Sequence, residues 1–216
     1  MAVKDYATKE LIVSYDVTRC IHAAECVRGA PAVFDPAAKP WIQPENGDPA
    51  EIAAVVRRCP TGALTVRRVD GSPIESPDAT NSLNVTPSGP LYLRGRVVFE
   101  GGAHASQVEY MRVALCRCGQ SQNKPLCDGR HKGAGFADPG RYSGGPPDDT
   151  TPGTPTGTVK VKPITNGPLM LQGWVEFKAA DGSTFIAGEK TWLCRCGQSG
   201  NKPFCDGSHK KVGFNG

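Results

Sequence analysis

Two stretches in the second half of the chain place an apolar or glycine residue at every second position. The repeated positions are Leu93, Gly95, Val97 and Phe99 in residues 91–99, and Leu171, Gly173, Val175 and Phe177 in residues 169–177. A period of two is typical of a strand with one buried face. We therefore expect two related strands. Each is followed by a hairpin and then by a second strand, which ends at Leu115 or Leu193.

The first 69 residues follow a different pattern. Residues 10–15 and 62–69 read as strands, and residues 50–58 read as a helix. Asp48 is a good N-cap for that helix, and Pro49 suits its first position because the missing N–H has no helical partner there. The sequence predicts a small α+β unit over residues 1–69.

Two segments poor in apolar residues divide the chain. Residues 70–87 lack a clear period and predict a linker, and residues 137–158 are rich in Pro, Gly, Thr and Asp, as in a linker or surface loop. The remaining segments, 88–136 and 159–216, predict two copies of a mainly β unit. The expected fold class is α+β, with a small α+β domain followed by this tandem.

The two copies are a true internal repeat. Residues 89–136 align with residues 167–214 without gaps, and 24 of 48 positions are identical. Self-similarity at a fixed offset indicates that each copy is one structural unit.

Each copy carries cysteine and histidine at the same spacing, C-x-C-x8-C-x3-H. The candidate ligands are Cys116, Cys118, Cys127 and His131 in the first copy, and Cys194, Cys196, Cys205 and His209 in the second. Three thiolates and one imidazole can hold a tetrahedral zinc ion or a two-iron cluster. The C-x-C pair is too tight for a normal zinc knuckle, but it can ligate one iron from a strand end.

The other three of the nine cysteines form a third group near the N-terminus. Cys20 and Cys26 are separated by five residues, and Cys59 precedes Pro60. All nine cysteines thus fall into three sets of three, which favours metal sites over disulfides.

Composition excludes several other classes. The net charge of +4 is too small to call for nucleic acid or a membrane surface. No apolar run reaches the length of a membrane span, and the first residues lack a signal peptide core. We expect a cytoplasmic protein. No nucleophile elbow, phosphate loop or catalytic carboxylate pair is found, so we expect no enzyme.

The two copies resemble CDGSH iron–sulfur domains, the family that includes the NEET proteins. The resemblance implies a [2Fe–2S] cluster in each copy. In the first copy Cys116 and Cys118 hold one iron, and Cys127 and His131 hold the other; the matching residues do so in the second copy. It also implies a β-sandwich with two cluster modules, here within one chain as a monomer with an internal pseudo-twofold axis.

The N-terminal segment resembles divergent single-cluster ferredoxin domains over about residues 10–68. The position of the middle cysteine of the ferredoxin motif falls on Ala23. Cys20, Cys26 and Cys59 therefore suit a [3Fe–4S] cluster. The alternative is a [4Fe–4S] cluster whose fourth ligand is water or His22.

Smaller expectations concern the residues around the ligands. Gly129 and Gly207 allow positive φ beside the cluster, and Asp128 and Asp206 cap a short helix there. We expect exposed histidine ligands. We expect the aromatic residues to lie in the core or to shield a cluster. These residues are Phe34, Trp41, Phe136, Trp192 and Phe214.

These features predict a single-electron carrier that works with redox partner proteins. The protonatable histidine ligands favour an alternative role in cluster storage, cluster transfer, or redox and pH sensing. A zinc-stapled interaction module is the third possibility.

Overall fold

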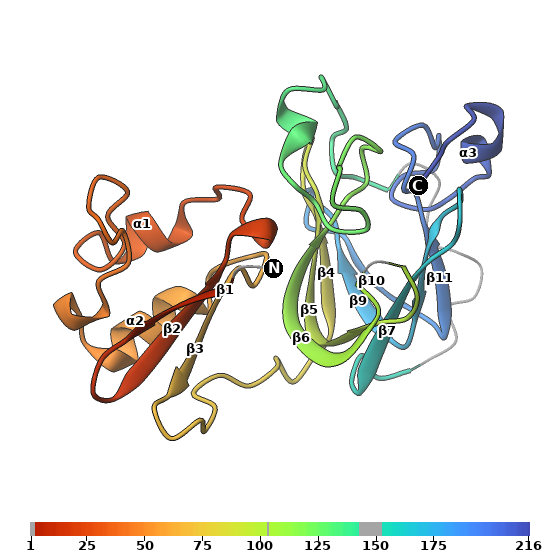
Figure 1. Cartoon of the computed structure of the whole chain (residues 1–216). Helices are drawn as coiled ribbons and strands as arrows, with labels where there is room; N and C mark the ends of the chain where they lie inside the picture. Colours follow the sequence, from red (N-terminus) through yellow and green to blue (C-terminus); the bar gives the residue numbers. More distant parts are fainter. Residues whose placement is uncertain (1–2, 103, 143–152) are drawn as a thin grey trace. The chain divides into compact units, whose positions relative to one another are not determined.

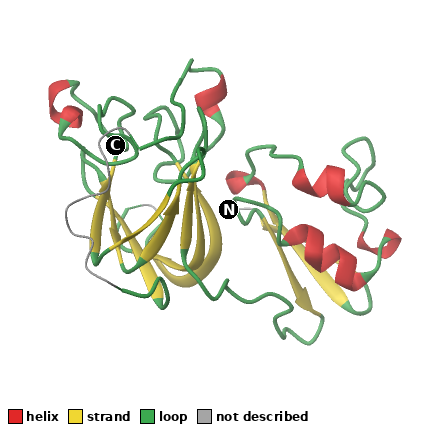
Figure 2. Ribbon diagram, turned by 180° about the vertical axis from the view of Figure 1, so that it is seen from behind, coloured by secondary structure: helices red, strands yellow, loops and turns green. Residues whose placement is uncertain are grey.

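The computed structural model describes residues 3–102, 104–142 and 153–216. The chain forms two compact units, Met1–Ser76 and Pro77–Gly216. Figure 2 shows that the first unit mixes helices and strands, whereas the second is built mainly of strands with short helical turns. The predicted α+β class, with a mainly β second part, is confirmed.

The first unit contains a three-stranded antiparallel sheet in the order β1-β2-β3. Its elements are β1 (Val3–Ala7), β2 (Leu11–Asp16), the 3-10 turn η1 (Val17–Arg19), α1 (Glu25–Gly29), the 3-10 turn η2 (Pro44–Asn46), α2 (Pro49–Val56) and β3 (Leu64–Arg68). The two predicted strands and the helix are present. The additional edge strand β1 was not predicted.

Helix α2 starts as its sequence predicts. The Asp48 carboxylate accepts the backbone N–H groups of Ala50 and Glu51 at 2.8 and 3.3 Å, and Pro49 follows as the first helical residue. The buried side of the helix then packs against the sheet. The apolar core of the first unit consists of Leu11, Val13, Val33, Phe34, Ile42, Ile52, Ala53, Val55, Val56, Leu64 and Val66.

The second unit is a β structure in which the two repeats exchange strands (Figure 1). Its first repeat gives β4 (Ser82–Val85), β5 (Leu91–Phe99), β6 (Ser106–Leu115) and the 3-10 turn η3 (Arg130–Lys132). Its second repeat gives β7 (Thr158–Pro163), β8 (Leu169–Gln172), β9 (Val175–Lys178), β10 (Thr184–Ala187), β11 (Lys190–Leu193) and α3 (Ser208–Lys211).

The exchange is reciprocal. β4 pairs with β5 of its own repeat and, in parallel, with β9 of the other repeat. β7 pairs with β8 of its own repeat and, in parallel, with the second half of β5. The strands of both repeats therefore form one eight-stranded sheet in the order β10-β9-β4-β5-β7-β8-β11, and β6 pairs with β5 beside this path. The pairing of β5 with β6 shifts register between Arg94 and Val97.

A single apolar core joins both repeats. It contains Leu83, Val85, Leu91, Leu93, Val97 and Phe99 from the first repeat, and Val159, Val161, Leu169, Leu171, Val175 and Phe177 from the second, among others. The alternating residues that predicted the strands are therefore the residues that the core buries.

The predicted linker over 70–87 contains the boundary between the two units, but it is wrong at its C-terminal end. Residues 82–85 form β4, which is central to the exchange. Nearer the first unit, the buried Glu75 carboxylate accepts the backbone N–H of Val66 at 3.0 Å, so this segment covers the edge of β3. β4 has only four residues, which is too short for an alternating pattern to be recognised in the sequence.

The predicted linker over 137–158 is described at its two ends only, and residues 143–152 lie outside the described residues. At the first end, Asp138 forms an ion pair with Arg117 and Tyr142 packs against the core of the second unit. At the second end, β7 begins at Thr158. None of the helices that the structure describes has the length and apolar content that a membrane span requires.

Candidate metal centres

A strand end and a short return loop position the ligands of each repeat. In the first repeat β6 ends at Leu115, and the next residue, Cys116, donates its N–H to the Pro125 carbonyl at 2.9 Å. Cys127 donates its N–H to the carbonyl of Ala114 at 2.8 Å. The loop therefore folds back antiparallel to the strand end and brings the third cysteine beside the first. The second repeat makes the same two bonds at 2.8 and 2.9 Å.

The four ligands of each repeat form two pairs. The sulfurs of Cys116 and Cys118 are 3.7 Å apart, and the Cys127 sulfur is 3.4 Å from Nδ1 of His131. The equivalent distances in the second repeat are 3.8 and 3.4 Å. Metal–sulfur bonds of about 2.3 Å in a tetrahedral site place two thiolates about 3.8 Å apart. Each pair is therefore spaced to share one metal ion.

Backbone amides point at these sulfurs. Gly129 N–H donates to the Cys127 sulfur at 3.3 Å, and Gln120 N–H lies 3.4 Å from the Cys118 sulfur. Gly129 and Gly207 have φ of 87° and 86°, as predicted for a conformation that favours glycine. Such amides stabilise the negative charge of thiolates and of any cluster that they hold.

The aspartates of the two loops act somewhat differently from the prediction. Gly129 and Gly207, rather than the aspartates, occupy the N-cap positions. Each aspartate still accepts the first helical N–H, that of Arg130 or Ser208. Asp206 also accepts the Gly200 N–H at 2.7 Å, and Asp128 makes the equivalent bond at 2.8 Å. These bonds hold the return loop against the helical turn.

The pKa values of the thiols show how strongly metal binding must compete with protons. Cys116 has its pKa lowered to about 6 because it accepts a hydrogen bond from Cys118, whose own pKa is raised. Burial raises the pKa of Cys127 to about 11 and raises those of Cys194 and Cys205. Loading these sites with metal must therefore displace thiol protons.

A buried arginine supports each C-x-C segment. The Arg117 guanidinium donates to the Gly89 carbonyl at 2.8 Å and to the Asp138 carboxylate at 2.6 Å, and it lies 5.1 Å from the ring centre of Phe136. Arg195 repeats this arrangement with the Gly167 carbonyl at 3.0 Å and Phe214 at 5.2 Å. Phe136 and Phe214 therefore pack on the arginines behind the ligands, and their shielding of a cluster stays a prediction.

The two C-x-C segments touch each other. A Cβ added to Gly119 would lie 2.6 Å from the backbone oxygen of Cys196, and one added to Gly197 would lie 2.6 Å from that of Cys118. Both glycines have positive φ, of 80° and 82°. The residue that follows each C-x-C must therefore be small, because it packs on the other site.

The histidines differ from each other, and the prediction of exposed histidine ligands is wrong for the first repeat. His131 is only 7% exposed and Cys127 is buried, whereas His209 and Cys205 are both partly exposed. Burial, followed by the positive charge of Lys132, lowers the pKa of His131. The sequence could not show this, because the ligand spacing is identical in both copies.

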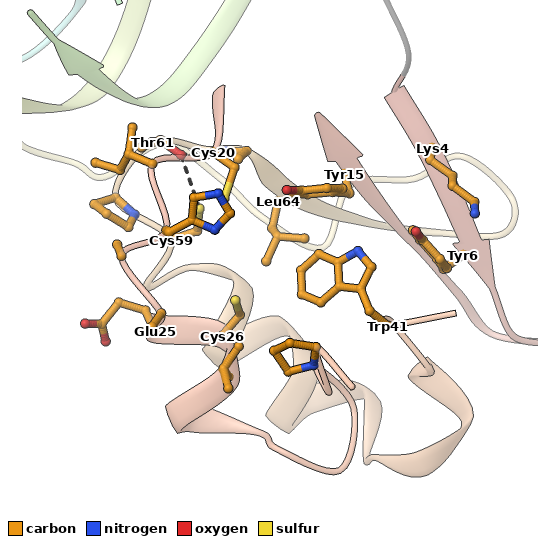
Figure 3. Close-up of a pocket in the computed structure, with 18 of the residues that line it drawn as sticks. Lys4, Tyr6, Tyr15, Cys20, Glu25, Cys26, Trp41, Cys59, Thr61 and Leu64 are labelled. Atoms are coloured by element: carbon orange, nitrogen blue, oxygen red, sulfur yellow. Dashed lines mark hydrogen bonds between the residues drawn. The ribbon is translucent and has the colours of Figure 1, made fainter. Parts of the chain in front are cut away.

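The N-terminal cysteines line one cavity of about 1060 Å³. Figure 3 shows Cys20, Cys26 and Cys59 around one end of it, with Trp41 and Leu64 forming a wall beside them. Cys59 also contacts the Thr61 hydroxyl at 3.5 Å. The structure therefore brings together the three residues that the sequence grouped.

The loop between Cys20 and Cys26 has an unusual backbone. His22 and Ala24 adopt φ of 55° and 62°, which is uncommon for residues that carry a Cβ. Such conformations often mark functional sites, where the surrounding structure enforces them. Ala23 lines the cavity between them, and His22 is exposed.

Tyr15 is a member of this site that the sequence did not reveal. Its ring packs edge-on against Trp41 with centres 5.0 Å apart, and its hydroxyl faces Cys20 (Figure 3). Burial, a hydrogen bond with Cys20 and the charges of the three cysteines raise the pKa of Tyr15. The phenol is thus a neutral donor directed at a candidate ligand.

The structure assigns roles to other residues that sequence reasoning missed or misplaced. His104 belongs to no motif in the sequence, and its Nε2 lies 3.0 Å from the Asn123 side-chain oxygen in the first return loop. Trp192 was expected in the core or as a shield, but it is 44% exposed on the outer side of β11. Phe34 lies in the core of the first unit as predicted.

Within the described part of the chain, no three or more His, Cys, Asp or Glu side chains converge as ligands of a single ion. This agrees with the pairwise arrangement of each repeat. A single tetrahedral zinc ion would require all four ligands of a repeat to lie about 3.5–3.8 Å from one another.

Family comparisons agree with this geometry. A family described as "Iron-binding zinc finger CDGSH type" matches residues 88–132 and 166–210, and one described as "Divergent 4Fe-4S mono-cluster" matches residues 6–69. The chain belongs to the CDGSH iron–sulfur proteins. It is a tandem CDGSH protein with a divergent single-cluster ferredoxin domain at its N-terminus.

Relatives of the ferredoxin domain occur in Escherichia coli. "Uncharacterized protein YjdI" of strain K12 is 37% identical over 62 residues, which cover 29% of this chain and 82% of that protein. The protein of the same name in strain O157:H7 gives the same values. No solved structure matches the chain.

Proposed function

We propose that this tandem CDGSH protein is a single-electron carrier with three iron–sulfur clusters. Each CDGSH repeat holds a [2Fe–2S] cluster on three cysteines and one histidine, and the N-terminal domain holds a third cluster on Cys20, Cys26 and Cys59. Clusters of these kinds supply reversible one-electron chemistry.

The pairing of the ligands is the observation that carries this proposal. A cysteine pair and a cysteine–histidine pair, each spaced for one metal ion, suit two irons that share bridging sulfides. A single zinc would need the two pairs to converge, which the described residues do not do. The division of the four ligands into two pairs, rather than the distance within a pair, therefore supports the cluster over the zinc-stapled module.

The N-terminal domain supplies three thiolates and no fourth. Ala23 lines the cavity where the ferredoxin motif has a cysteine, and His22 is exposed to solvent while also lining the cavity. This set favours a [3Fe–4S] cluster. A [4Fe–4S] cluster with a non-cysteine fourth ligand is the alternative, and the size of the cavity accommodates either.

The protein supplies the environment that an electron carrier requires. Amides directed at the sulfurs, buried arginines behind both C-x-C segments and a buried first site all favour a fixed geometry in both oxidation states. We assign no catalytic residues to the chain. We propose that it exchanges electrons with redox partner proteins. The parallel pairings between the repeats join their strands into one sheet within one chain, which supports a monomer with an internal pseudo-dimer.

The test is an iron and acid-labile sulfide assay of anaerobically purified protein, combined with EPR and redox titration. We expect about seven irons per chain and an EPR signal in the oxidised state from the N-terminal cluster. We also expect full reduction and reoxidation with the clusters retained. Colourless protein with stoichiometric zinc would refute the proposal, and about four irons would remove the N-terminal cluster from it.

A role in cluster transfer is the second candidate, because one specific observation favours it. Cys205 and His209 of the second repeat are more exposed than their counterparts in the first. An acceptor can therefore reach this pair. Transfer of one cluster per chain to an apo-ferredoxin within minutes would support this role, whereas repeated redox cycling without loss of iron supports the electron carrier.

A further inference from the structure

Trp192 is an exposed aromatic residue attached directly to the second cluster site. Its carbonyl accepts the N–H of the ligand Cys205 at 2.9 Å, and the ligand Cys194 is two residues further along the chain. Figure 1 shows β11, which carries Trp192, running toward the end of the structure that holds α3. Any protein that covers Trp192 therefore lies beside the second cluster site.

The strands around Trp192 form an outer face of lysine and apolar residues. Trp192 pairs with Met170 of β8, and Met170 pairs with Lys162 of β7, so these side chains share one face. Lys190, two residues before Trp192, lies on the same face and is exposed. Val159 and Val161, which alternate with the lysines along β7, point the other way into the core.

More lysines lie on the helical turn of the same site. Lys210 and Lys211 follow the ligand His209 and are both exposed. Among the described residues, no carboxylate forms an ion pair with Lys162, Lys190, Lys210 or Lys211, whereas the nearby Lys160 is paired with Glu100 at 2.8 Å. Lys162 and Lys190 thus share the outer strand face with Trp192, and Lys210 and Lys211 add positive charge on the helical turn of the same cluster site.

The first repeat provides an internal comparison, because it has no exposed tryptophan and fewer exposed lysines at the equivalent positions; Lys210 corresponds to Lys132, and Lys190 corresponds to the buried Arg112. The residues at the positions of Trp192, Lys162 and Lys211 are Ala114, Asn84 and Gly133. Ala114 is buried at 2% exposure. The ligands and the buried arginine are shared by both repeats, so the cluster site itself does not require a tryptophan at this position.

We propose that the outer face around Trp192, with Lys162, Lys190, Lys210 and Lys211, is a docking surface for an acidic single-electron carrier protein. Tryptophan and methionine are enriched at the centres of protein interfaces, and tryptophan is a frequent energetic hot spot. The lysine charges attract an acidic partner and orient it. The second unit as a whole has sixteen basic and eleven acidic side chains, which supports the same sign.

This assignment rests on the proposed electron-carrier function and specifies the site at which electrons enter or leave. Docking at Trp192 brings the carrier next to the more exposed ligand pair, Cys205 and His209. The second cluster is then the one that exchanges electrons with this carrier.

The experiment uses the full-length holoprotein and a flavodoxin as the acidic probe. The dissociation constant is measured by calorimetry at low and high salt, and reduction by the flavodoxin hydroquinone is followed by stopped-flow absorbance. Wild-type binding should weaken steeply with salt. We expect Trp192→Ala to weaken binding about tenfold or more, and we expect the pair Lys162→Glu and Lys210→Glu to do the same.

The matched control is the pair Asn84→Glu and Lys132→Glu at the equivalent positions of the first repeat, which adds two glutamates and changes the net charge by −3, against −4 for the test pair. It should change binding by less than about twofold. Iron content shows that each variant retains its clusters. Binding that is insensitive to salt, or equally weakened by the control pair, would overturn the surface assignment.

The two levels of the proposal fail separately. If dithionite and ferricyanide reduce and reoxidise the clusters reversibly, but the Trp192 and lysine substitutions leave flavodoxin affinity unchanged, the docking surface is wrong and the carrier function stands. If the clusters cannot be cycled by these small molecules, the carrier function is wrong, whatever binds to the surface.

Discussion

Gly119→Ala, a substitution in the first CDGSH repeat, should weaken the cluster site of the second. The added Cβ would lie 2.6 Å from the backbone oxygen of Cys196, whereas ordinary contacts of this kind lie at 3.4–4 Å. A backbone atom cannot rotate away as a side chain can. The Cys196 segment must therefore move, and it carries a ligand of the other site.

The free-energy cost of Gly119→Ala has two parts, backbone strain and overpacking. A residue with a Cβ at φ of 80° costs roughly 1–2 kcal/mol in backbone strain. Overpacking of a tight contact costs roughly another 1–3 kcal/mol. Gly182→Ala is the matched control, because Gly182 has a φ of 87° and nothing within 4 Å of the added Cβ. Gly182→Ala therefore introduces the backbone strain of a positive φ without any overpacking.

The assay removes the first cluster so that only the second is observed in the CDGSH unit. In a Cys127→Ser, His131→Ala background, loss of the remaining [2Fe–2S] absorbance is timed under a chelator. We expect Gly119→Ala to accelerate that loss about tenfold or more, and Gly182→Ala to leave it within about twofold, because about 1.4 kcal/mol corresponds to a factor of ten. An unchanged rate in the Gly119→Ala protein would refute the contact between the two sites.

Three further predictions follow from single contacts. Asp138→Asn leaves the buried Arg117 without its counter-ion, so chemical denaturation should show a loss of about 3 kcal/mol, against less than about 1 kcal/mol for Glu109→Gln at an exposed ion pair. Asp206→Ala removes the acceptor of two loop amides, so the second cluster should be lost faster than the first, as timed by absorbance. Tyr15→Phe removes a donor directed at Cys20, so the midpoint potential of the N-terminal cluster should fall in a redox titration.

Each of these has its own control or contrary result. Equal losses for Asp138→Asn and Glu109→Gln would mean that burial of the pair is unimportant. Asp128→Ala should reverse the order of cluster loss relative to Asp206→Ala, since it breaks the equivalent bonds in the first repeat. The two [2Fe–2S] potentials serve as internal references for Tyr15→Phe, and a common shift of all three potentials would contradict a local effect.

Much of the ligand chemistry could be predicted from sequence because it depends on short-range spacing. C-x-C at a strand end, and a cysteine two residues before the N-cap glycine of the short helical turn that carries the histidine, place their side chains together by local geometry. The repeat at a constant offset, the strand alternation and the Asp48 cap are likewise local signals. These features accordingly appear in the structure where the sequence predicted them.

Other features depend on segments far apart in the chain. β4 was taken for a linker because its four residues become a strand only when β5 and β9 pair with them on either side. Tyr15 joins Cys20 and Cys59 only because β2 pairs with β3 beside the cysteine loop. Neither relation leaves a signal within a window of a few residues.

The sequence by itself determined that this protein has three cysteine sets, two of them in equivalent repeats, because covalent spacing fixes which side chains can share a metal. Only the tertiary structure decided how the equivalent copies differ. Identical ligand spacing gives a buried His131 and a partly exposed His209, and equivalent positions give a buried Ala114 and an exposed Trp192. Exposure and contact between the sites depend on what packs around each loop, and that is set by the strand exchange and the meeting of Gly119 with Cys196.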